Sequence, residues 1–288
     1  MVKNYLSLIK FSHTIFALPF AMVGFSLGTL AHGERLSWAL LALVLVCMVS
    51  ARSAAMAFNR YLDRDIDQKN PRTQIREIPA GIISPKSALT FVILSCFVFI
   101  LATYFINSLC FMLSPVALLV VLGYSYTKRF TAFCHLVLGL GLGLAPVGAY
   151  LAVTGAFDVL PIYYGLAVLC WVSGFDVIYA LQDEDFDKGQ ALHSIPVALG
   201  KTGALRLSIA LHIGCAIFMT LAAMQLGRFD GIFHTIHFVG LSIFLFLLSY
   251  QHTLVKPNDL SKVNMAFFTT NGIASCIYGT LFLLDIFC

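Results

Sequence analysis

The chain contains 288 residues, of which 59% are hydrophobic and only 11% charged, and its formal net charge is +4. A soluble domain carries about 25% charged residues, so this composition excludes an ordinary soluble domain and indicates an integral membrane protein. The basic residues are spread between apolar stretches and form no separate cationic surface with interleaved aromatic residues, so no nucleic-acid partner is expected. The eight cysteines show no CxxC or Cys/His metal spacing, which is typical of reduced, buried thiols.

Apolar stretches of about 20 residues, the length that crosses a bilayer, recur along the whole chain. We expect an all-α, polytopic membrane protein, a single domain over residues 1–288, with nine transmembrane helices. Their predicted ranges are 12–31, 37–59, 87–106, 109–126, 133–153, 160–180, 204–226, 232–251 and 265–286. Only Asn107 and Ser108 separate the third and fourth spans, yet a single helix of about 40 residues would overrun the bilayer.

The basic residues predict the orientation of these spans. Of the 18 Lys and Arg, Arg35 and Arg228 lie on one side, Arg52 lies within a span, and the other fifteen lie on the opposite side. The positive-inside rule therefore predicts a cytoplasmic N-terminus. Lys3 and Lys10 precede the first span as in a signal peptide, but that span is long and lacks a clear cleavage site, so we interpret it as a retained helix.

Polar residues interrupt the apolar pattern at the end of the second span. Arg52, Asn59, Asp63 and Asp67 are spaced by seven, four and four residues, which predicts that they share one face of a helix. Asp65 lies on a different face. A membrane-embedded Arg costs about 2.5–3.5 kcal/mol on insertion scales and usually faces a partner or a wet cavity, so Arg52 is either a structural residue or part of a site.

The end of the sixth span repeats this arrangement. Asp176, Asp183 and Asp187 are spaced by seven and four residues, and Asp185 lies on a different face. Because the two stretches end spans that are four apart in order, the second and the sixth, the pattern favours an internal repeat of two four-helix units followed by a ninth helix. By the orientation above, both stretches face the cytoplasm, which predicts a multi-pass protein of the inner or plasma membrane with its active site on the cytoplasmic side.

A single acidic residue at the end of a span is most simply a solvated interface carboxylate, but here eight of the fourteen acidic residues fall in these two stretches. Like charges at i and i+4 destabilise a helix by about 0.2–0.5 kcal/mol per pair without a counterion. We therefore expect one shared cation site. Magnesium fits best, since Mg²⁺ combines a few carboxylate oxygens with waters and phosphate oxygens, whereas zinc prefers His and Cys.

The motif Asn59-x-x-x-Asp63-x-x-x-Asp67, and the motif Asp183-x-x-x-Asp187 preceded by Asp176 and Tyr179, resemble the paired aspartate motifs of the UbiA superfamily of intramembrane prenyltransferases. The segments NPRTQIREIPAG, GYSYTKR, HSIP and VNMAFFTTNG extend the resemblance over nearly the whole chain. It implies nine transmembrane helices, with the two motifs at the cytoplasmic ends of the second and sixth, where they hold a prenyl diphosphate through Mg²⁺.

The resemblance also implies roles for individual residues. The implied metal ligands are Asn59, Asp63, Asp67, Asp176, Asp183 and Asp187, and the implied catalytic residues among them are Asp63, Asp67, Asp183 and Asp187. The implied substrate-binding residues are Arg52, Asn59, Arg72, Arg76, Lys128 and Tyr179. Many members have N-D-x-x-D, whereas Arg60 follows Asn59 in this chain, so the resemblance implies one carboxylate fewer at this position.

These residues predict Mg²⁺-dependent transfer of a polyprenyl group from polyprenyl diphosphate to an aromatic acid acceptor in quinone synthesis. Both 4-hydroxybenzoate and a dihydroxynaphthoate stay open as acceptors, because the Arg60 variant resembles a 4-hydroxybenzoate polyprenyltransferase-like subgroup with members that serve menaquinone synthesis. A cation-coupled secondary transporter is the alternative, but its carboxylates would lie at the midplane of the membrane. A CDP-alcohol phosphotransferase would need a D-x-x-D-G-x-x-A-R motif, which the chain lacks.

Overall fold

The computed structural model of the chain describes residues 2–10, 14, 16–33, 36–230 and 234–288. Its secondary structure is helical, and the only strand-like pairing in these ranges is one isolated bridge between Lys256 and Asp259. The longer helices are α2 Leu18–His32, α3 Trp38–Leu62, α5 Pro85–Ile106, α6 Ser108–Thr127, α7 Cys134–Thr154, α8 Val159–Ala180, α10 Ile195–Asp230, α11 Thr235–Leu254 and α12 Asn271–Phe287. The shorter elements are α1 Val2–Leu8, α4 Arg64–Lys69, a 3₁₀ turn Leu181–Asp183, α9 Glu184–Gly189 and a π-helix Met265–Thr270.

The predicted all-α, polytopic class is confirmed. Within the described ranges, eight helices are long and apolar enough to cross a bilayer, and α2 is a shorter apolar helix of 15 residues. The predicted start of the first span at residue 12 was wrong for this helix: α2 begins at Leu18, with Pro19 in its first turn, where proline favours helix initiation. Of the predicted range, residues 12, 13 and 15 lie outside the described residues.

A short helical segment that the sequence did not predict precedes the seventh span, so the element α10 begins at Ile195. Ser194 precedes this segment, its Oγ accepts a hydrogen bond from the Val197 amide at 3.4 Å, and its carbonyl oxygen accepts one from the Ala198 amide. Gly200, at φ 66° and ψ 172°, is not helical and separates the short segment from the long helix that follows. The predicted start of the seventh span at residue 204 therefore lies near the beginning of the long helix.

Asn107 separates α5 from α6, as the sequence predicts. Its backbone is extended, and its Oδ1 accepts a hydrogen bond from the Cys110 amide at 2.8 Å, so it acts as the N-cap of α6. The side-chain amide of Asn107 also donates to the carbonyl oxygen of Leu151 at 2.9 Å, near the end of α7. This one residue thus ends the third span, starts the fourth and ties both to the fifth.

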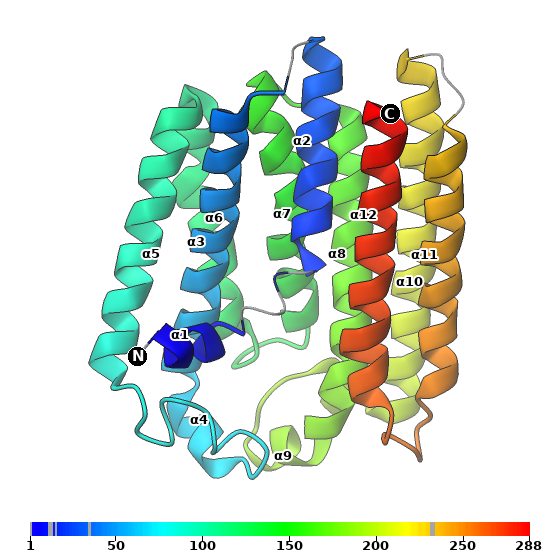
Figure 1. Cartoon of the computed structure of the whole chain (residues 1–288). Helices are drawn as coiled ribbons and strands as arrows, with labels where there is room; N and C mark the ends of the chain where they lie inside the picture. The colour runs from blue at the N-terminus through cyan, green and yellow to red at the C-terminus, as the bar shows by residue number, and fades with distance from the viewer. Residues whose placement is uncertain (1, 11–13, 15, 34–35, 231–233) are drawn as a thin grey trace.

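The long helices run side by side, and both polar motifs lie at one end of the bundle (Figure 1). The short helices α1, α4 and α9 are at this end, together with the N-terminus, whereas the C-terminus is at the other end. The two motifs thus face the same side, as predicted, although the chain segments that carry them are far apart in the sequence.

Helix α8 is largely buried in the bundle. It packs closely on α7: a Cβ placed on Gly143 would lie 2.6 Å from the carbonyl oxygen of Gly165, so glycine permits this approach of the two backbones. Trp171 of this helix is fully buried and contacts the rings of Phe20, Phe175 and Phe244. This aromatic core between α2, α8 and α11 supports the helix from which the second motif projects.

Candidate active site

The first motif lies at a break between two helices. Helix α3 ends at Leu62, Asp63 has φ −91° and ψ 7°, and α4 begins at Arg64. The prediction of an unbroken helix here was wrong. However, the Asp63 amide still donates to the Asn59 carbonyl oxygen at 2.9 Å, and the Asp67 amide donates to the Asp63 carbonyl oxygen at 2.7 Å. Because these bonds preserve the spacing of one helical turn, Asn59, Asp63 and Asp67 stay on the same side.

The second motif lies at a break with nearly the same geometry. Helix α8 ends at Ala180, the 3₁₀ turn leads to Asp183 at φ −104° and ψ 3°, and α9 follows. The short helices α4 and α9 have six residues each, and each carries a buried aspartate four residues after the break, Asp67 and Asp187. Both motifs therefore present one carboxylate at a helix break and a second one turn further along.

Basic side chains hold the carboxylates of the first motif. Arg76 Nη1 lies 2.6 Å from Oδ1 and 2.8 Å from Oδ2 of Asp67. Arg129 Nη2 donates to Asp63 Oδ1 at 2.9 Å, and the Asn59 amide donates to Asp63 Oδ2 at 3.1 Å. Burial raises the pKa of the Asp63 carboxyl, and the Arg129 guanidinium only partly offsets this effect.

The carboxylates of the second motif have basic partners from other parts of the chain. Arg72, in the loop after the first motif, donates from Nε to Asp183 Oδ1 at 3.0 Å, from Nη2 to Asp183 Oδ2, and from Nη1 to the Tyr179 hydroxyl at 2.8 Å. Burial lowers the pKa of Arg72, but its pairing with Asp183 outweighs burial and leaves the pKa above its ordinary value. Lys128 Nζ lies 2.8 Å from Asp187 Oδ1. The two motifs are thus linked through charge pairs.

Three further residues of this region were not in the predicted site. Arg129 follows Lys128 directly, so the sequence signal that placed Lys128 in the predicted site applied equally to Arg129. His135 Nδ1 lies 2.7 Å from Asp176 Oδ2, and a histidine at the start of an apolar span was its only signal. Arg60, where the resemblance implies a missing carboxylate, is buried at the end of α3 and lines the same cavity as the motifs.

No three His, Cys, Asp or Glu side chains within the described ranges converge closely enough to hold a metal ion. The physical reason is visible in the ion pairs, since Asp63, Asp67, Asp183 and Asp187 are each turned toward a basic side chain. Their hard oxygen donors nevertheless suit Mg²⁺, which needs only a few carboxylates when phosphate oxygens complete its coordination. These carboxylate oxygens therefore fit magnesium, provided that the Arg and Lys side chains now paired with them move to another anion.

The motifs line a polar cavity of ≈ 530 Å³. Asp63, Asp67, Asp176, Asp183 and Asp187 all contribute to its wall. The N-terminal segment contributes as well, because α1 is tied to the loop after the first motif by a hydrogen bond from Ser7 Oγ to Glu77 Oε1, and both residues line the cavity.

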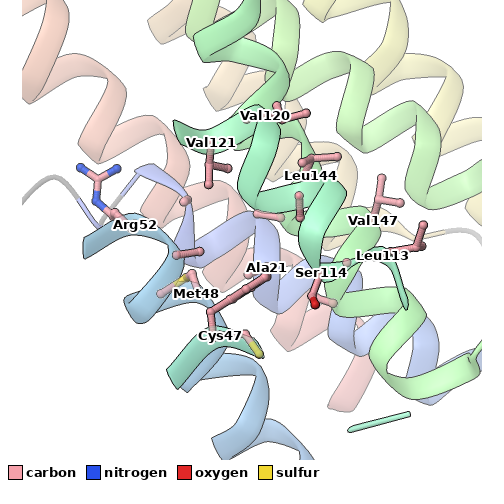
Figure 2. Close-up of a pocket in the computed structure, with 18 of the residues that line it drawn as sticks. Ala21, Cys47, Met48, Arg52, Leu113, Ser114, Val120, Val121, Leu144 and Val147 are labelled. Atoms are coloured by element: carbon pink, nitrogen blue, oxygen red, sulfur yellow. The ribbon is translucent and has the colours of Figure 1, made fainter. Parts of the chain in front are cut away.

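A second, apolar cavity of ≈ 380 Å³ lies next to the polar cavity, between α3, α6 and α7. Arg52 and Tyr124 line both cavities, so they mark the junction. Figure 2 shows Arg52 at the edge of the apolar cavity, with Met48 and Cys47 about one turn earlier on α3 and Val121 of α6 opposite. The Nε of Arg52 is buried and has no hydrogen-bond partner, which leaves a buried donor available at the junction.

The fold and the site define an all-α, multi-pass membrane protein whose two aspartate motifs face one cavity. Residues 17–273 match the model of the UbiA prenyltransferase family, so the chain belongs to this family, as the motifs indicate, and it is a prenyltransferase. It is 31% identical over 236 residues to the 4-hydroxybenzoate octaprenyltransferase of Nitrosomonas eutropha, covering 81% of this chain and 79% of that protein. It is 30% identical over 252 residues to the enzyme of the same name from Nitrosomonas europaea, covering 86% of this chain and 83% of that protein.

Solved structures agree with this assignment. The apo structure of a UbiA homolog from Aeropyrum pernix K1 superposes with a TM-score of 0.83 and 31% identity, covering 95% of this chain and 98% of that one. A UbiA homolog from Archaeoglobus fulgidus bound to DMAPP and Mg²⁺ has a TM-score of 0.73 and 20% identity, covering 98% and 99% of the two chains. At 20% identity this second likeness shows the fold alone.

Proposed function

We propose that this protein transfers a polyprenyl group from polyprenyl diphosphate to an aromatic acid, 4-hydroxybenzoate or a dihydroxynaphthoate, in ubiquinone or menaquinone biosynthesis. The observation that carries the proposal is the junction at Arg52 and Tyr124 between a charged cavity and an apolar one. A prenyl diphosphate has the same division, with an anionic head and a hydrocarbon tail. The relatives named 4-hydroxybenzoate octaprenyltransferase support the benzoate as acceptor.

Magnesium is the proposed cofactor, and the Archaeoglobus fulgidus homolog bound to DMAPP and Mg²⁺ supports it. The oxygens that would hold it belong to Asn59, Asp63, Asp67, Asp176, Asp183 and Asp187. When bound, Mg²⁺ neutralises the diphosphate and makes pyrophosphate a better leaving group.

The basic side chains exchange partners when the substrate binds. Arg72, Arg76 and Lys128, together with Arg129, leave the carboxylates and donate charge-assisted hydrogen bonds to the diphosphate oxygens. The carboxylates are then free for the metal. Tyr179, whose hydroxyl accepts from Arg72 at 2.8 Å and whose ring stacks on Phe267 at 4.2 Å, holds the Arg72 side chain over the site.

The apolar cavity accommodates the prenyl tail and protects the reaction. Its lining is formed mainly by aliphatic side chains of α3, α6 and α7. Loss of pyrophosphate from the substrate leaves an allylic cation, which water would convert to an alcohol, so exclusion of water from this region favours attack by the aromatic ring. The ring then loses a proton and regains its aromaticity.

Arg52 orients the acceptor. Both candidate acids carry a carboxylate, and a guanidinium can bind a carboxylate through two parallel hydrogen bonds. The position of Arg52 at the junction of the cavities, seven residues before Asn59, would hold the ring between the diphosphate and the tail. The cytoplasmic location of this site is supported by the fifteen Lys and Arg on its side of the predicted topology.

A reconstituted assay tests the proposal. Purified protein in lipid nanodiscs receives Mg²⁺, a polyprenyl diphosphate and each acid in turn, and pyrophosphate release is measured together with the mass of the prenylated acid. We expect release only when Mg²⁺ and one of the acids are both present. The assignment would be overturned if neither acid led to release of pyrophosphate. It would also be overturned if substrate accumulated inside sealed proteoliposomes without any release of pyrophosphate.

A further inference from the structure

His135 is a buried side chain wedged between the second motif and the start of α10. It is the second residue of α7, and 4% of its surface is exposed. Its Nδ1 lies 2.7 Å from Asp176 Oδ2, and its Nε2 lies 3.4 Å from the backbone nitrogen of Ile195. The carbonyl oxygen of His135 also accepts a hydrogen bond from Ser173 Oγ at 3.1 Å, which ties the start of α7 to α8.

Both ring nitrogens of His135 face groups of the protein. Nδ1 faces the Asp176 carboxylate, which accepts a hydrogen bond from it, and Nε2 faces the backbone amide of Ile195 at 3.4 Å. His135 lines the polar cavity, but its contact with the site is made through Asp176.

Asp176 differs from the four aspartates of the two motifs. Asp63, Asp67, Asp183 and Asp187 are paired with Arg or Lys, whereas Asp176 is paired with His135. The Asp176 side chain keeps 22% of its surface exposed and lines the polar cavity. Within the described part of the chain, the ion pairs place no Arg or Lys on Asp176.

We propose that His135 is a positioning residue that holds Asp176 in the orientation needed to bind the divalent cation. The inference rests on the proposed function, because it assigns Asp176 to the metal. Hydrogen bonds to ligating carboxylates fix their orientation, and their loss typically weakens metal binding by about 10–100-fold.

Two substitutions separate this role from a purely structural one. In H135N the amide nitrogen occupies about the place of Nδ1 and can still donate to Asp176, whereas in H135Q the amide oxygen occupies about the place of Nε2 and can still accept from Ile195. The full-length protein is purified in detergent with the unreactive analogue farnesyl S-thiolodiphosphate at a fixed concentration. The thermal unfolding midpoint is measured as Mg²⁺ is added, and the Mg²⁺ concentration that gives half of the maximal rise is the Mg²⁺ requirement of each variant. The midpoint without ligands shows whether the variant is folded and how stable it is.

We expect H135N to stay within about threefold of the wild-type Mg²⁺ requirement and H135Q to need about 10–100 times more Mg²⁺. The reverse order, or equal effects of the two variants, would overturn the proposal, since a structural tie to Ile195 would favour the glutamine. A cycle with D176N gives a second criterion that does not depend on H135N folding: H135Q should add no further loss to D176N, and full additivity would contradict the proposal. If the wild-type protein itself shows no Mg²⁺-dependent shift, the proposed function has failed and not the role of His135.

Discussion

Arg72, in the loop that follows the first aspartate motif, forms a two-pronged ion pair with Asp183 at the break of the second motif, 111 residues further along the chain. The Arg72 guanidinium also lies over the ring of Tyr179, with 5.2 Å between Cζ and the ring centroid. The ligand-free site is thus closed by charges from the protein itself. In the proposed function, a metal ion would compete with Arg72 for Asp183, and a diphosphate would compete with Asp183 for Arg72.

The first prediction is that Mg²⁺ and the diphosphate bind cooperatively. Either ligand alone must break these ion pairs and leave a charged side chain without a partner, whereas both together satisfy every charge. We expect each ligand to tighten the binding of the other roughly 5–150-fold, the usual range of coupling between sites. Isothermal titration of farnesyl S-thiolodiphosphate, with and without Mg²⁺, measures this coupling.

Arg72→Gln should reduce this coupling, because Asp183 then becomes available to Mg²⁺ alone. Arg64→Gln is the matched control, since Arg64 pairs with the exposed Asp65 and contacts the Tyr61 carbonyl oxygen and ring. Equal coupling in the Arg72 variant and the wild type would contradict the exchange of partners.

The second prediction concerns the motif carboxylates. Asp63→Ala and Asp183→Ala should each lower the rate of prenyl transfer by about 100-fold or more, because each removes a negative group that helps to stabilise the departing pyrophosphate through the metal. The protein should still fold and insert, since Arg129 and Arg72, which lose their partners, are partly exposed and can be solvated. Turnover and detergent-solubilised yield are measured for both variants.

The control for these variants is the aspartate two residues away. Asp65 is largely exposed, with 76% of its side chain accessible, and Asp185 is exposed as well. Asp65→Asn and Asp185→Asn should therefore keep most of the activity. A loss in Asp65→Asn equal to that in Asp63→Asn would mean that Asp65 is a ligand through the helix break.

The third prediction tests the role of Arg52. Arg52→Lys should raise the Michaelis constant of the acceptor roughly tenfold or more, because lysine cannot reproduce the paired hydrogen bonds of a guanidinium with a carboxylate. The affinity for prenyl diphosphate should stay nearly unchanged. Both constants are measured with 4-hydroxybenzoate and with a dihydroxynaphthoate, and the preferred acid identifies the quinone pathway. A fall in prenyl diphosphate affinity with an unchanged acceptor constant would instead place Arg52 on the diphosphate.

The fourth prediction concerns pH and Asp63, whose pKa is raised mainly by burial. A carboxyl with a higher pKa in the folded state stabilises the fold fully below its unfolded value of 3.8 and loses this contribution as the pH rises through the raised value. Asp63→Asn should therefore gain thermal stability relative to the wild type as the pH rises from about 4 to about 8. Unfolding midpoints of the ligand-free proteins test this, with Asp65→Asn as the control. A difference that does not change with pH, or that shrinks as the pH rises, would count against a raised pKa of Asp63.

Local pattern in the sequence was enough to predict the membrane class, the positions of most spans and the two motifs. The reason is that the length of an apolar stretch and a spacing of four residues act within one helix, so they are written in neighbouring positions. Asn107 is an example: its side chain caps α6 at the position where the sequence requires two spans instead of one. The resemblance of the motifs then predicted the family, which the comparison confirmed.

The tertiary structure decided which charges meet. Arg72 pairs with Asp183 and Arg129 with Asp63, and His135 meets Asp176, across separations of 111, 66 and 41 residues. No periodicity within one segment encodes such partners, since they depend on how helices far apart in sequence converge at one end of the bundle. The sequence also gives no local signal for the helix breaks at Asp63 and Asp183, because neither position has a Gly or Pro that would end a helix.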